Sequence, residues 1–467
     1  MTIQSINPAT EEVLATFDEA TPKQIDEALA DARAGFSQWR ATSVTERSRV
    51  LHDAAGYVRA DKEKFAALIT AEMGKPIVEA EVEVEKCAVC CDFYADHAAT
   101  FIADQPVATN ARESLVVFQP LGPVLAIMPW NFPFWQVVRF AAPALMAGNA
   151  AVLKPAPNVP QCARAIEEVF RRVGLPDGAF QTLLIGTDPI PGIIADDRIA
   201  AVTLTGSIGA GRAVAAAAGG ALKKTVLELG GSDPFIVLPD ADLDGAVDYA
   251  VRSRYQNAGQ SCIAAKRFIV VGEIADEFES RFTEVVAGLR VGDPTRRETQ
   301  VGPMARENLR AEVERQVRES VTQGAHVLTG GNALNQLGHY YAPTVLADVR
   351  PTMSAFQEEV FGPVAAVIRV RDAEEAVATA NNSAYGLGGN LWTRDVEKGK
   401  ALARRIESGS VFINGMTASD PRLPFGGVKY SGYGRELSSF GIHEFVNVQA
   451  LWIGPAQGLT QPAPPAE

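Results

Sequence analysis

The spacing of apolar residues along the chain predicts a helical segment followed by two segments of mixed helix and strand. From residue 20 to residue 91, apolar residues recur every three or four positions, which is the period of one buried helix face. Helices are therefore predicted over 26–39, 44–59 and 62–71. We expect these helices to cover a sheet.

Beyond residue 115, short β-rich runs alternate with helical patterns. The predicted strands are 124–127, 151–153, 181–185 and 201–204, and the predicted helices between them are 134–146, 159–173 and 190–195. This alternation indicates an α/β fold, a parallel sheet with crossover helices. Such sheets bind nucleotides beside the carboxyl ends of their strands.

A second alternating segment begins near residue 235 and predicts a separate α/β domain. Its predicted strands are 235–238 and 268–271, and its predicted helices are 243–254, 278–289 and 308–323. Residues 440–453 are then expected to form a strand that returns to another domain or subunit. The proline-containing tail, 454–467, is expected to be disordered.

Composition and charge indicate a globular protein and disfavour several classes of partner. Of the 467 residues, 47% are hydrophobic and 21% are charged, as in ordinary globular proteins. The net charge of −13 repels phosphate backbones, so nucleic-acid binding is not expected. The most apolar stretch, 121–153, contains proline, glycine and arginine, and no signal peptide is evident. Five cysteines fit a reducing compartment, so we expect a cytoplasmic protein without membrane attachment.

Cys262 is the first candidate for chemistry because it ends a run of small and polar residues. The run before it, Asn257–Ser261, interrupts a helical pattern and places the thiol after a loop. A cysteine attacks as its thiolate, which requires a lowered pKa and access to substrate. A buried inert cysteine fits this segment equally well. The other cysteines and the scattered histidines show no metal-ligand spacing, so no metal site is predicted.

Glu228 and Asn131 are candidates for proton transfer and for stabilising negative charge. Glu228 lies in an apolar strand that ends in two glycines; burial there would raise its pKa and suit it to act as a general base towards water. The alternative is an ion pair with Lys223 or Lys224 at the sheet edge. Asn131, in Pro-Trp-Asn-Phe-Pro, is held rigidly enough to donate to an oxyanion, although the motif could also be only a tight turn.

Two strand ends have the features of a nucleotide site. The run 202–212 contains Gly206, Gly209 and Gly211 between a strand and a helix, a context in which backbone N–H groups can meet a pyrophosphate. The spacing is not the usual GxGxxG, and an ordinary turn is the alternative. Lys154 follows another strand and could reach ribose or phosphate oxygens, or could be a surface lysine.

The order of these motifs resembles the aldehyde dehydrogenase superfamily, from about residue 6 to residue 445. The motifs are Pro-Trp-Asn-Phe-Pro, Lys-Pro, Thr-Gly-Ser, Glu-Leu-Gly-Gly, Asn-x-Gly-Gln-x-Cys, Glu-Glu-x-Phe-Gly-Pro and Pro-Phe-Gly-Gly. Within the superfamily, the chain is most similar to the bacterial succinate-semialdehyde dehydrogenases.

The resemblance implies a Rossmann-like cofactor domain, a catalytic domain and a small β element for oligomerisation. The corresponding ranges are 1–112 with 120–228 for the cofactor domain, 229–430 for the catalytic domain, and 113–119 with 440–453 for the oligomerisation strands. A homodimer or a homotetramer is therefore expected.

The resemblance also assigns roles to individual residues. Cys262 would attack the aldehyde carbon, the Asn131 amide and the Cys262 N–H would hold the oxyanion, and Glu228 would deprotonate the water that hydrolyses the thioester. Glu359 would hold the nicotinamide ribose, with a helix cap as its alternative role. The positions expected to contact the cofactor are Trp130, Lys154, Ala156, Pro157, Thr205, Gly206, Ser207, Gly211, Leu229, Glu359 and Phe361.

Substrate choice is predicted from an arginine in an apolar segment. Arg139 would be costly there without an anionic partner, and the resemblance implies that Arg139 and Ser419 bind the far carboxylate of the substrate. Trp135, Phe132 and Phe425 would then line the methylene chain. The alternative is that Arg139 forms a salt bridge within the protein. Succinate semialdehyde is the expected substrate, and glutarate semialdehyde could also fit.

Pro157 bears on the choice of cofactor. NAD-preferring relatives often carry a glutamate at this position, and proline offers no negative charge to repel a 2′-phosphate. The expected cofactor is NADP or NAD, with NADP favoured and no metal required. The alternatives to a dehydrogenase are a cysteine hydrolase, for which no histidine partner is evident, and a non-catalytic protein on the same fold.

Overall fold

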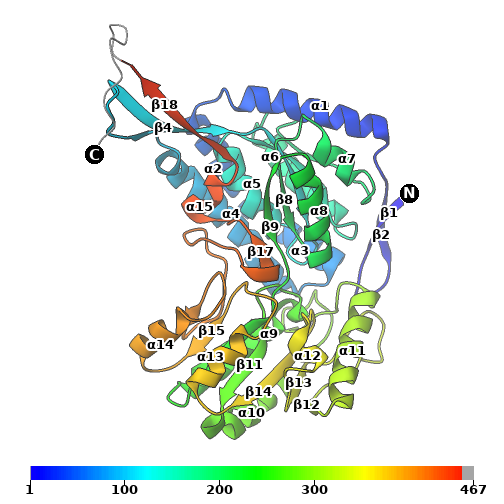
Figure 1. Ribbon diagram of the computed structural model, residues 1–467. Coiled ribbons are helices and arrows are strands. Elements are labelled where there is room, and N and C mark those ends of the chain that lie inside the picture. The colour runs from blue at the N-terminus through cyan, green and yellow to red at the C-terminus, as the bar shows by residue number, and fades with distance from the viewer. Residues whose placement is uncertain (1, 455–467) are drawn as a thin grey trace.

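Two mostly parallel sheets form the framework of the molecule, one in each lobe (Figure 1). The computed structural model describes residues 2–454. The sheet of the first lobe has the order β17 (Gly432–Tyr433), β9 (Lys224–Glu228), β8 (Ala201–Thr205), β5 (Pro123–Met128), β6 (Ala150–Pro155) and β7 (Phe180–Thr182). Only the edge strand β17 runs antiparallel to its neighbour.

Helices cover both faces of the first sheet because its strands are apolar on both sides. Along β5, Val124 and Ala126 face one hydrophobic cluster and Leu125 faces another. The first cluster packs under α2 (Val44–Ala60), α3 (Lys62–Met73), α4 (Ile77–Phe101), α5 (Trp135–Met146) and α6 (Pro160–Arg172). The second packs under α1 (Pro22–Trp39), α7 (Ile190–Ala195) and α8 (Ile208–Gly220). This is the doubly covered parallel sheet predicted from the alternating pattern.

The sheet of the second lobe is covered in the same way. Its order is β12 (His326–Thr329), β13 (Thr344–Ala347), β14 (Val364–Val370), β11 (Ala265–Val271), β10 (Asp233–Val237), β15 (Asn390–Trp392) and β16 (Phe412–Ile413), with only β12 antiparallel. The helices are α9 (Leu243–Tyr255), α10 (Gly272–Ala287), α11 (Glu307–Thr322), α12 (Ser354–Gln357), α13 (Ala373–Asn381) and α14 (Val396–Ala403). The predicted α/β fold is thus confirmed in both lobes.

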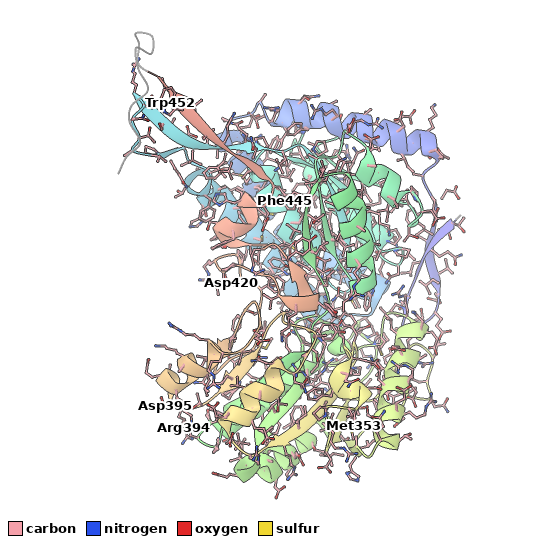
Figure 2. The ribbon with its side chains drawn as sticks, viewed as in Figure 1. Met353, Arg394, Asp395, Asp420, Phe445 and Trp452 are labelled. Carbon is pink, nitrogen blue, oxygen red and sulfur yellow. The ribbon has the colours of Figure 1, made fainter. Side chains whose placement is uncertain are left out.

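A long two-stranded ribbon extends from the first lobe. It pairs β4 (Glu113–Pro120) antiparallel with β18 (Val446–Ile453), and β3 (Gln105–Pro106) adds a short edge to β4. Figure 2 places Phe445 in the first lobe and Trp452 towards the far end of the ribbon. Val448 and Trp452 are exposed there, which leaves apolar side chains uncovered in a single chain.

The predicted strand 440–453 is wrong in its first part. Residues Ser438–His443 form helix α15, and the strand begins only at Val446. Ser438, Gly441 and Ile442 are buried, a spacing of three and four residues that matches a helix face rather than a strand. Apart from Gly454, the tail predicted to be disordered, 454–467, lies outside the described residues.

Most other predicted elements are present with small changes at their ends. The larger differences are the predicted helix 278–289, which begins earlier, at Gly272, and the predicted strand 181–185, which ends earlier, at Thr182. The hairpin of β1 (Thr2–Ile6) and β2 (Val13–Asp18) was not predicted. Among the described residues, no helix combines the length and the apolar character needed to cross a membrane.

Candidate active site

A cavity of about 230 Å³ lies beside the carboxyl ends of β5, β8 and β9. The residues that follow these three strands line it together with Cys262 and with loops of the second lobe. The lining consists of Pro129, Trp130, Asn131, Gln136, Thr205, Gly206, Ser207, Leu229, Gly230, Cys262, Arg306, Leu309, Glu359 and Phe361. Strand ends of a parallel sheet are the expected position for a nucleotide site.

Cys262 follows a turn whose backbone is unusual. Asn257, Ala258 and Gly259 have φ values of 52°, 53° and 72°, all in the left-handed region. The Asn257 N–H donates to Glu79 Oε2 of α4 at 2.6 Å, and Asn257 Nδ2 donates to the carbonyl oxygen of Asn131 at 2.8 Å. A left-handed backbone is strained for residues other than glycine. These bonds hold Asn257 and Ala258 in that conformation.

The Cys262 thiol is protonated in the resting site. Burial raises its pKa to about 12, while the positive charges of Arg139 and Lys266 oppose the shift. The residue itself remains partly exposed, because it borders the cavity. Access from the cavity distinguishes Cys262 from an inert core cysteine. The thiol still needs a proton acceptor before it can attack.

Lys266 lies behind the nucleophile turn. Its Nζ donates to the carbonyl oxygens of Ser261 at 2.9 Å and Cys262 at 2.8 Å, and it forms an ion pair with Glu359 at 3.5 Å. The other side of the turn packs against Gly231, where a Cβ atom would lie 2.5 Å from the Cys262 carbonyl oxygen. Lys266 and the glycine thus fix the position of the Cys262 backbone.

Asn131 lies next to Cys262 in the cavity. Its side-chain Nδ2 donates one hydrogen bond to the Gln260 carbonyl oxygen at 3.0 Å, which leaves its second N–H free for another acceptor. The segment is anchored further by Glu83 of α4, whose Oε1 accepts from the backbone N–H groups of Phe134 and Trp135 at 2.9 and 3.0 Å. Hydrogen bonds thus hold Asn131 itself and the two residues that follow the Pro-Trp-Asn-Phe-Pro segment.

Glu228 ends strand β9 and is 2% exposed. Neither of its carboxylate oxygens has a hydrogen-bond partner among the described residues. Burial, and then the nearby Glu436 carboxylate, raise its pKa well above the usual value, against the effect of Arg139. Glu228 lies in the lining of neither of the two cavities that Cys262 borders.

The alternative ion pairs for Glu228 are absent from the described residues. Lys224 pairs with Glu444 at 3.0 Å, and Lys223 donates to the Asp196 carbonyl oxygen. An unpaired, buried carboxyl group of this kind is a candidate general base.

Most of the residues predicted to bind cofactor are brought together around the cavity. Those in the lining are Trp130, Thr205, Gly206, Ser207, Leu229, Glu359 and Phe361. Ser207 caps α8 by accepting the Ala210 N–H at 3.3 Å, so the helix N-terminus follows β8 directly. Gly211 lies against Leu229, where a Cβ atom would come within 2.6 Å of Cδ1.

Lys154, Ala156 and Pro157 lie outside that lining, at and beyond the end of β6. Lys154 is only 7% exposed, so the surface-lysine alternative is wrong. Because β6 is the neighbour of β5, these residues continue the same sheet edge away from Cys262. The set fits an extended dinucleotide, with its reactive end at Cys262 and its other end beyond β6.

Glu359 is not a helix cap. Helix α12 ends before it at Gln357, and Glu359 Oε1 accepts the Gly231 N–H at 3.0 Å. Its carboxylate therefore faces the cavity from the second lobe, opposite the first-lobe strand ends.

A second cavity, of about 80 Å³, lies on the other side of Cys262. All five residues predicted to bind substrate line it, namely Phe132, Trp135, Arg139, Ser419 and Phe425. The Arg139 guanidinium lies 4.5 Å from the centroid of the Phe425 ring. Cys262 thus borders both cavities, one with the cofactor residues and one with the substrate residues.

Arg139 does form a salt bridge within the protein, as the alternative interpretation held. Its Nε pairs with the Glu436 carboxylate, and Nη2 donates to Thr205 Oγ1 at 3.3 Å. Both charged side chains are almost fully buried, at 2% and 4% exposed. Arg139 still lines the substrate cavity, but part of its charge is already neutralised.

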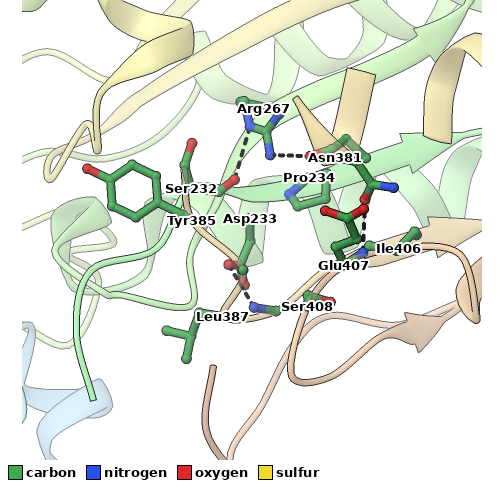
Figure 3. Close-up of a pocket in the computed structure, with 13 residues that line it drawn as sticks. Ser232, Asp233, Pro234, Arg267, Asn381, Tyr385, Leu387, Ile406, Glu407 and Ser408 are labelled. Carbon is green, nitrogen blue, oxygen red and sulfur yellow. Dashed lines mark hydrogen bonds between the residues drawn. The ribbon is translucent and has the colours of Figure 1, made fainter. Parts of the chain in front are cut away.

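Figure 3 shows a smaller pocket in the second lobe, of about 10 Å³. Asp233 accepts the Gly388 N–H at 3.0 Å, and Arg267 Nε donates to the Ser232 carbonyl oxygen at 3.0 Å. The space suits no more than a single water molecule. Its groups serve to join β10 to the loop after α13.

Sequence reasoning missed four charged residues of the site: Glu79, Lys86, Lys266 and Glu436. Glu79 and Lys86 were detectable, because α4 carries charges along a face that also buries Ala80, Val84 and Cys87. Charges on an apolar face are a signal of function. Glu436 and Lys266 gave no such signal. Among the described residues, no cluster of three or more His, Cys, Asp or Glu side chains is arranged to hold a metal ion.

The chain is similar to known proteins over nearly its whole length. It is 53% identical to a protein of Synechocystis named probable succinate-semialdehyde dehydrogenase [NADP(+)], over 97% of this chain and 100% of the relative. It is 51% identical to the succinate semialdehyde dehydrogenase [NAD(P)+] Sad of Escherichia coli K12, over 96% of this chain and 97% of the relative.

A solved structure agrees with these relatives. The succinic semialdehyde dehydrogenase of Streptococcus pyogenes, in complex with NADP+, superposes with a TM-score of 0.95 at 40% identity, over 97% of this chain and 100% of that one. The model of the aldehyde dehydrogenase family matches residues 1–451. The chain therefore belongs to the aldehyde dehydrogenase family.

Proposed function

We propose that this protein oxidises succinate semialdehyde to succinate, with NADP as the favoured cofactor and NAD as the alternative. The observation that carries the proposal is the position of Cys262 between a cavity lined by cofactor-type residues and a cavity lined by Arg139 and Ser419. The names of the similar proteins from Synechocystis, E. coli and S. pyogenes support the same substrate and cofactor.

The first step is attack of Cys262 Sγ on the aldehyde carbon. The thiol must first lose its proton to water in the cavity that it borders, because only the thiolate attacks. Attack forms a C–S bond and places negative charge on the former carbonyl oxygen. The free N–H of the Asn131 amide and the backbone N–H of Cys262 then donate to this oxygen.

The bound nicotinamide supplies the hydride acceptor when the cofactor is present. The residues that would hold it are Trp130, Glu359 and Phe361 in the cavity lining, with Glu359 at the ribose, and Lys154 with the α8 N-terminus. Loss of hydride from the adduct leaves a thioester on Cys262.

The last step is hydrolysis of the thioester. Glu228 accepts a proton from water, the resulting hydroxide adds to the acyl carbon, and the C–S bond breaks. Succinate leaves, and the Cys262 sulfur is regenerated. Because Glu228 is buried outside the lining of the cavity, its side chain must rotate towards Cys262 for this step.

The carboxylate of the substrate determines the choice among aldehydes. Arg139 and Ser419 offer it a positive charge and a hydroxyl group, while Phe132, Trp135 and Phe425 surround the methylene groups. The cavity of about 80 Å³ favours a short chain, although glutarate semialdehyde is only one methylene longer.

The test is direct. Purified protein is mixed with succinate semialdehyde and with NADP or NAD, and the absorbance of the reduced cofactor is followed. We expect reduction with both cofactors, a higher kcat/KM with NADP, and no reduction by Cys262→Ala. Absence of reduction with several aldehydes would reject an enzymatic role. A strong preference for an aldehyde without a carboxylate would reject succinate semialdehyde.

Assembly and location form part of the proposal. The exposed apolar side chains Val448 and Trp452 on the β4–β18 ribbon suit pairing with a second copy of this chain, which gives a homodimer or homotetramer. Light scattering of the purified protein measures the mass. The five free cysteines are consistent with a cytoplasmic enzyme.

A further inference from the structure

Lys86 of α4 carries a positive charge that the proposed reaction has not yet used. It lines the cavity of about 80 Å³ that contains Cys262 and also an adjoining cavity of about 630 Å³. Phe132, Trp135 and Met416 line both cavities as well. Lys86 therefore lies where the larger cavity meets the smaller one.

Two contacts fix the Lys86 ammonium group. Nζ donates to Ser419 Oγ at 2.7 Å and lies 4.2 Å from the centroid of the Trp135 ring. Among the described residues, no carboxylate lies within ion-pair distance of it. An ammonium group has three N–H donors, so Lys86 keeps donors for a further acceptor.

The hydrogen bonds at Ser419 determine the direction of its hydroxyl proton. Ser419 Oγ accepts from Lys86 Nζ and also from Trp135 Nε1 at 3.0 Å. A hydroxyl oxygen has two lone pairs, and both are occupied by these donors. The Ser419 O–H is therefore available only as a donor, which suits it to bind an anion.

The other charges near Lys86 already have partners. Arg139 pairs with Glu436, Glu83 pairs with Lys75, and Asp420 pairs with Arg422. On α4 itself, Cys87 and Cys90 are neutral, because burial raises the pKa of each thiol well above its usual value. Lys86 is thus the cation of this cavity whose charge is not compensated.

We propose that Lys86 is a specificity-determining residue that binds the substrate carboxylate together with Ser419, beside Arg139, whose charge is partly neutralised by Glu436. The inference rests on the proposed oxidation of succinate semialdehyde and adds the source of its charge recognition. A substrate whose aldehyde group is at Cys262 in the smaller cavity has its carboxylate towards Lys86, where the larger cavity begins.

Titration of Lys86 adds a second observable. Burial, and then the charge of Arg139, lower the pKa of Lys86 to about 8. The ammonium form binds the carboxylate, so kcat/KM for succinate semialdehyde, which reports the free enzyme, falls as the pH rises through this value. An aldehyde without a carboxylate is not affected by this titration.

The experiment compares Lys86→Met and Lys86→Arg with the wild type on two substrates of equal length, succinate semialdehyde and butanal. We expect Lys86→Met to raise KM for the semialdehyde by about 10- to 100-fold, the effect of losing one charge-assisted contact, and to leave butanal unchanged. Lys86→Arg should retain most of the semialdehyde activity. Lys23→Met, at a lysine whose side chain is 85% exposed, is the matched control.

The pH profile separates recognition from packing. In the wild type, the ratio of kcat/KM for the semialdehyde to that for butanal should fall above about pH 8, and in Lys86→Met the ratio should be flat. Equal losses on both substrates, or no change on either, would overturn the role of Lys86. A loss on both would indicate instead that Lys86 only positions Trp135 and Ser419.

Succinate provides a test that does not depend on turnover of the semialdehyde. It should inhibit butanal oxidation by the wild type competitively with the aldehyde, and its inhibition constant should rise at least tenfold in Lys86→Met. If the wild type oxidises butanal but not succinate semialdehyde, the proposed function fails. Succinate inhibition that is the same in both proteins rejects Lys86 as the anchor.

Discussion

The guanidinium group of Arg139 and the carboxylate of Glu436 form an ion pair in which both side chains are almost fully buried. The pair adjoins both the substrate cavity and Glu228, because Arg139 lines the cavity and both charges of the pair act on the pKa of Glu228. It therefore links substrate recognition to the strength of the candidate base.

Glu436→Gln should lower the pKa of Glu228. The substitution removes a negative charge beside Glu228 and frees Arg139, and both changes favour the ionised carboxylate. The rise of kcat with pH that reports deprotonation of Glu228 should therefore move to lower pH. The measurement is kcat against pH in both proteins. A profile that does not move would show that Glu228 and Glu436 are not coupled.

Glu228→Gln should separate acylation from hydrolysis of the thioester. The amide cannot accept the proton from water, so the slow step becomes release of the acyl group. Rapid mixing should show a burst of reduced cofactor close to the number of active sites, followed by a steady rate lower by about 10²–10⁴-fold. Loss of the burst together with the steady rate would assign Glu228 to activation of the thiol instead.

Asn131→Ala should lower kcat by roughly 10²–10³-fold, the usual effect of losing one oxyanion donor. The same change also removes the hydrogen bond from Asn131 Nδ2 to Gln260. Asn131→Asp is the companion variant, since it keeps the size but places a negative charge beside the oxyanion, and it should be at least as slow. A melting temperature close to that of the wild type shows that the loss is chemical.

Pro157→Glu should shift cofactor use towards NAD. A carboxylate at this exposed position repels the 2′-phosphate of NADP and accepts from a free ribose hydroxyl. We expect kcat/KM with NADP to fall by about 10- to 100-fold while that with NAD is kept or improved. Pro157→Gln, similar in size but neutral, is the control. Equal effects of the two variants would mean that charge is not the cause.

The sequence predicts the nucleophile, the base and the amide because the chemical role of each can be inferred from the residues next to it in the chain. Cys262, Glu228 and Asn131 each adjoin a turn or a strand end, and the structure places Cys262 and Asn131 on one cavity. The α/β pattern likewise follows from local periodicity. These features depend on neighbours in the sequence.

The features that escaped prediction depend on contacts between distant segments. Arg139 and Glu436 lie far apart in the sequence, and Lys86 meets Ser419 across 333 positions. Helix α15 was mistaken for the start of a strand because its buried face spans only Ser438, Gly441 and Ile442. Such pairings are set by packing, and no local pattern encodes them.

The conformation of the turn before Cys262 depends on contacts with the first lobe. Its left-handed residues Asn257 and Ala258 are held by Glu79 and by the Asn131 carbonyl oxygen, both of which belong to the first lobe. A fragment containing only the second lobe would lack both acceptors and would lose this backbone conformation. The reactivity of Cys262 thus requires both lobes. In a fragment of the second lobe alone, Cys262 would react as a cysteine in a flexible peptide does.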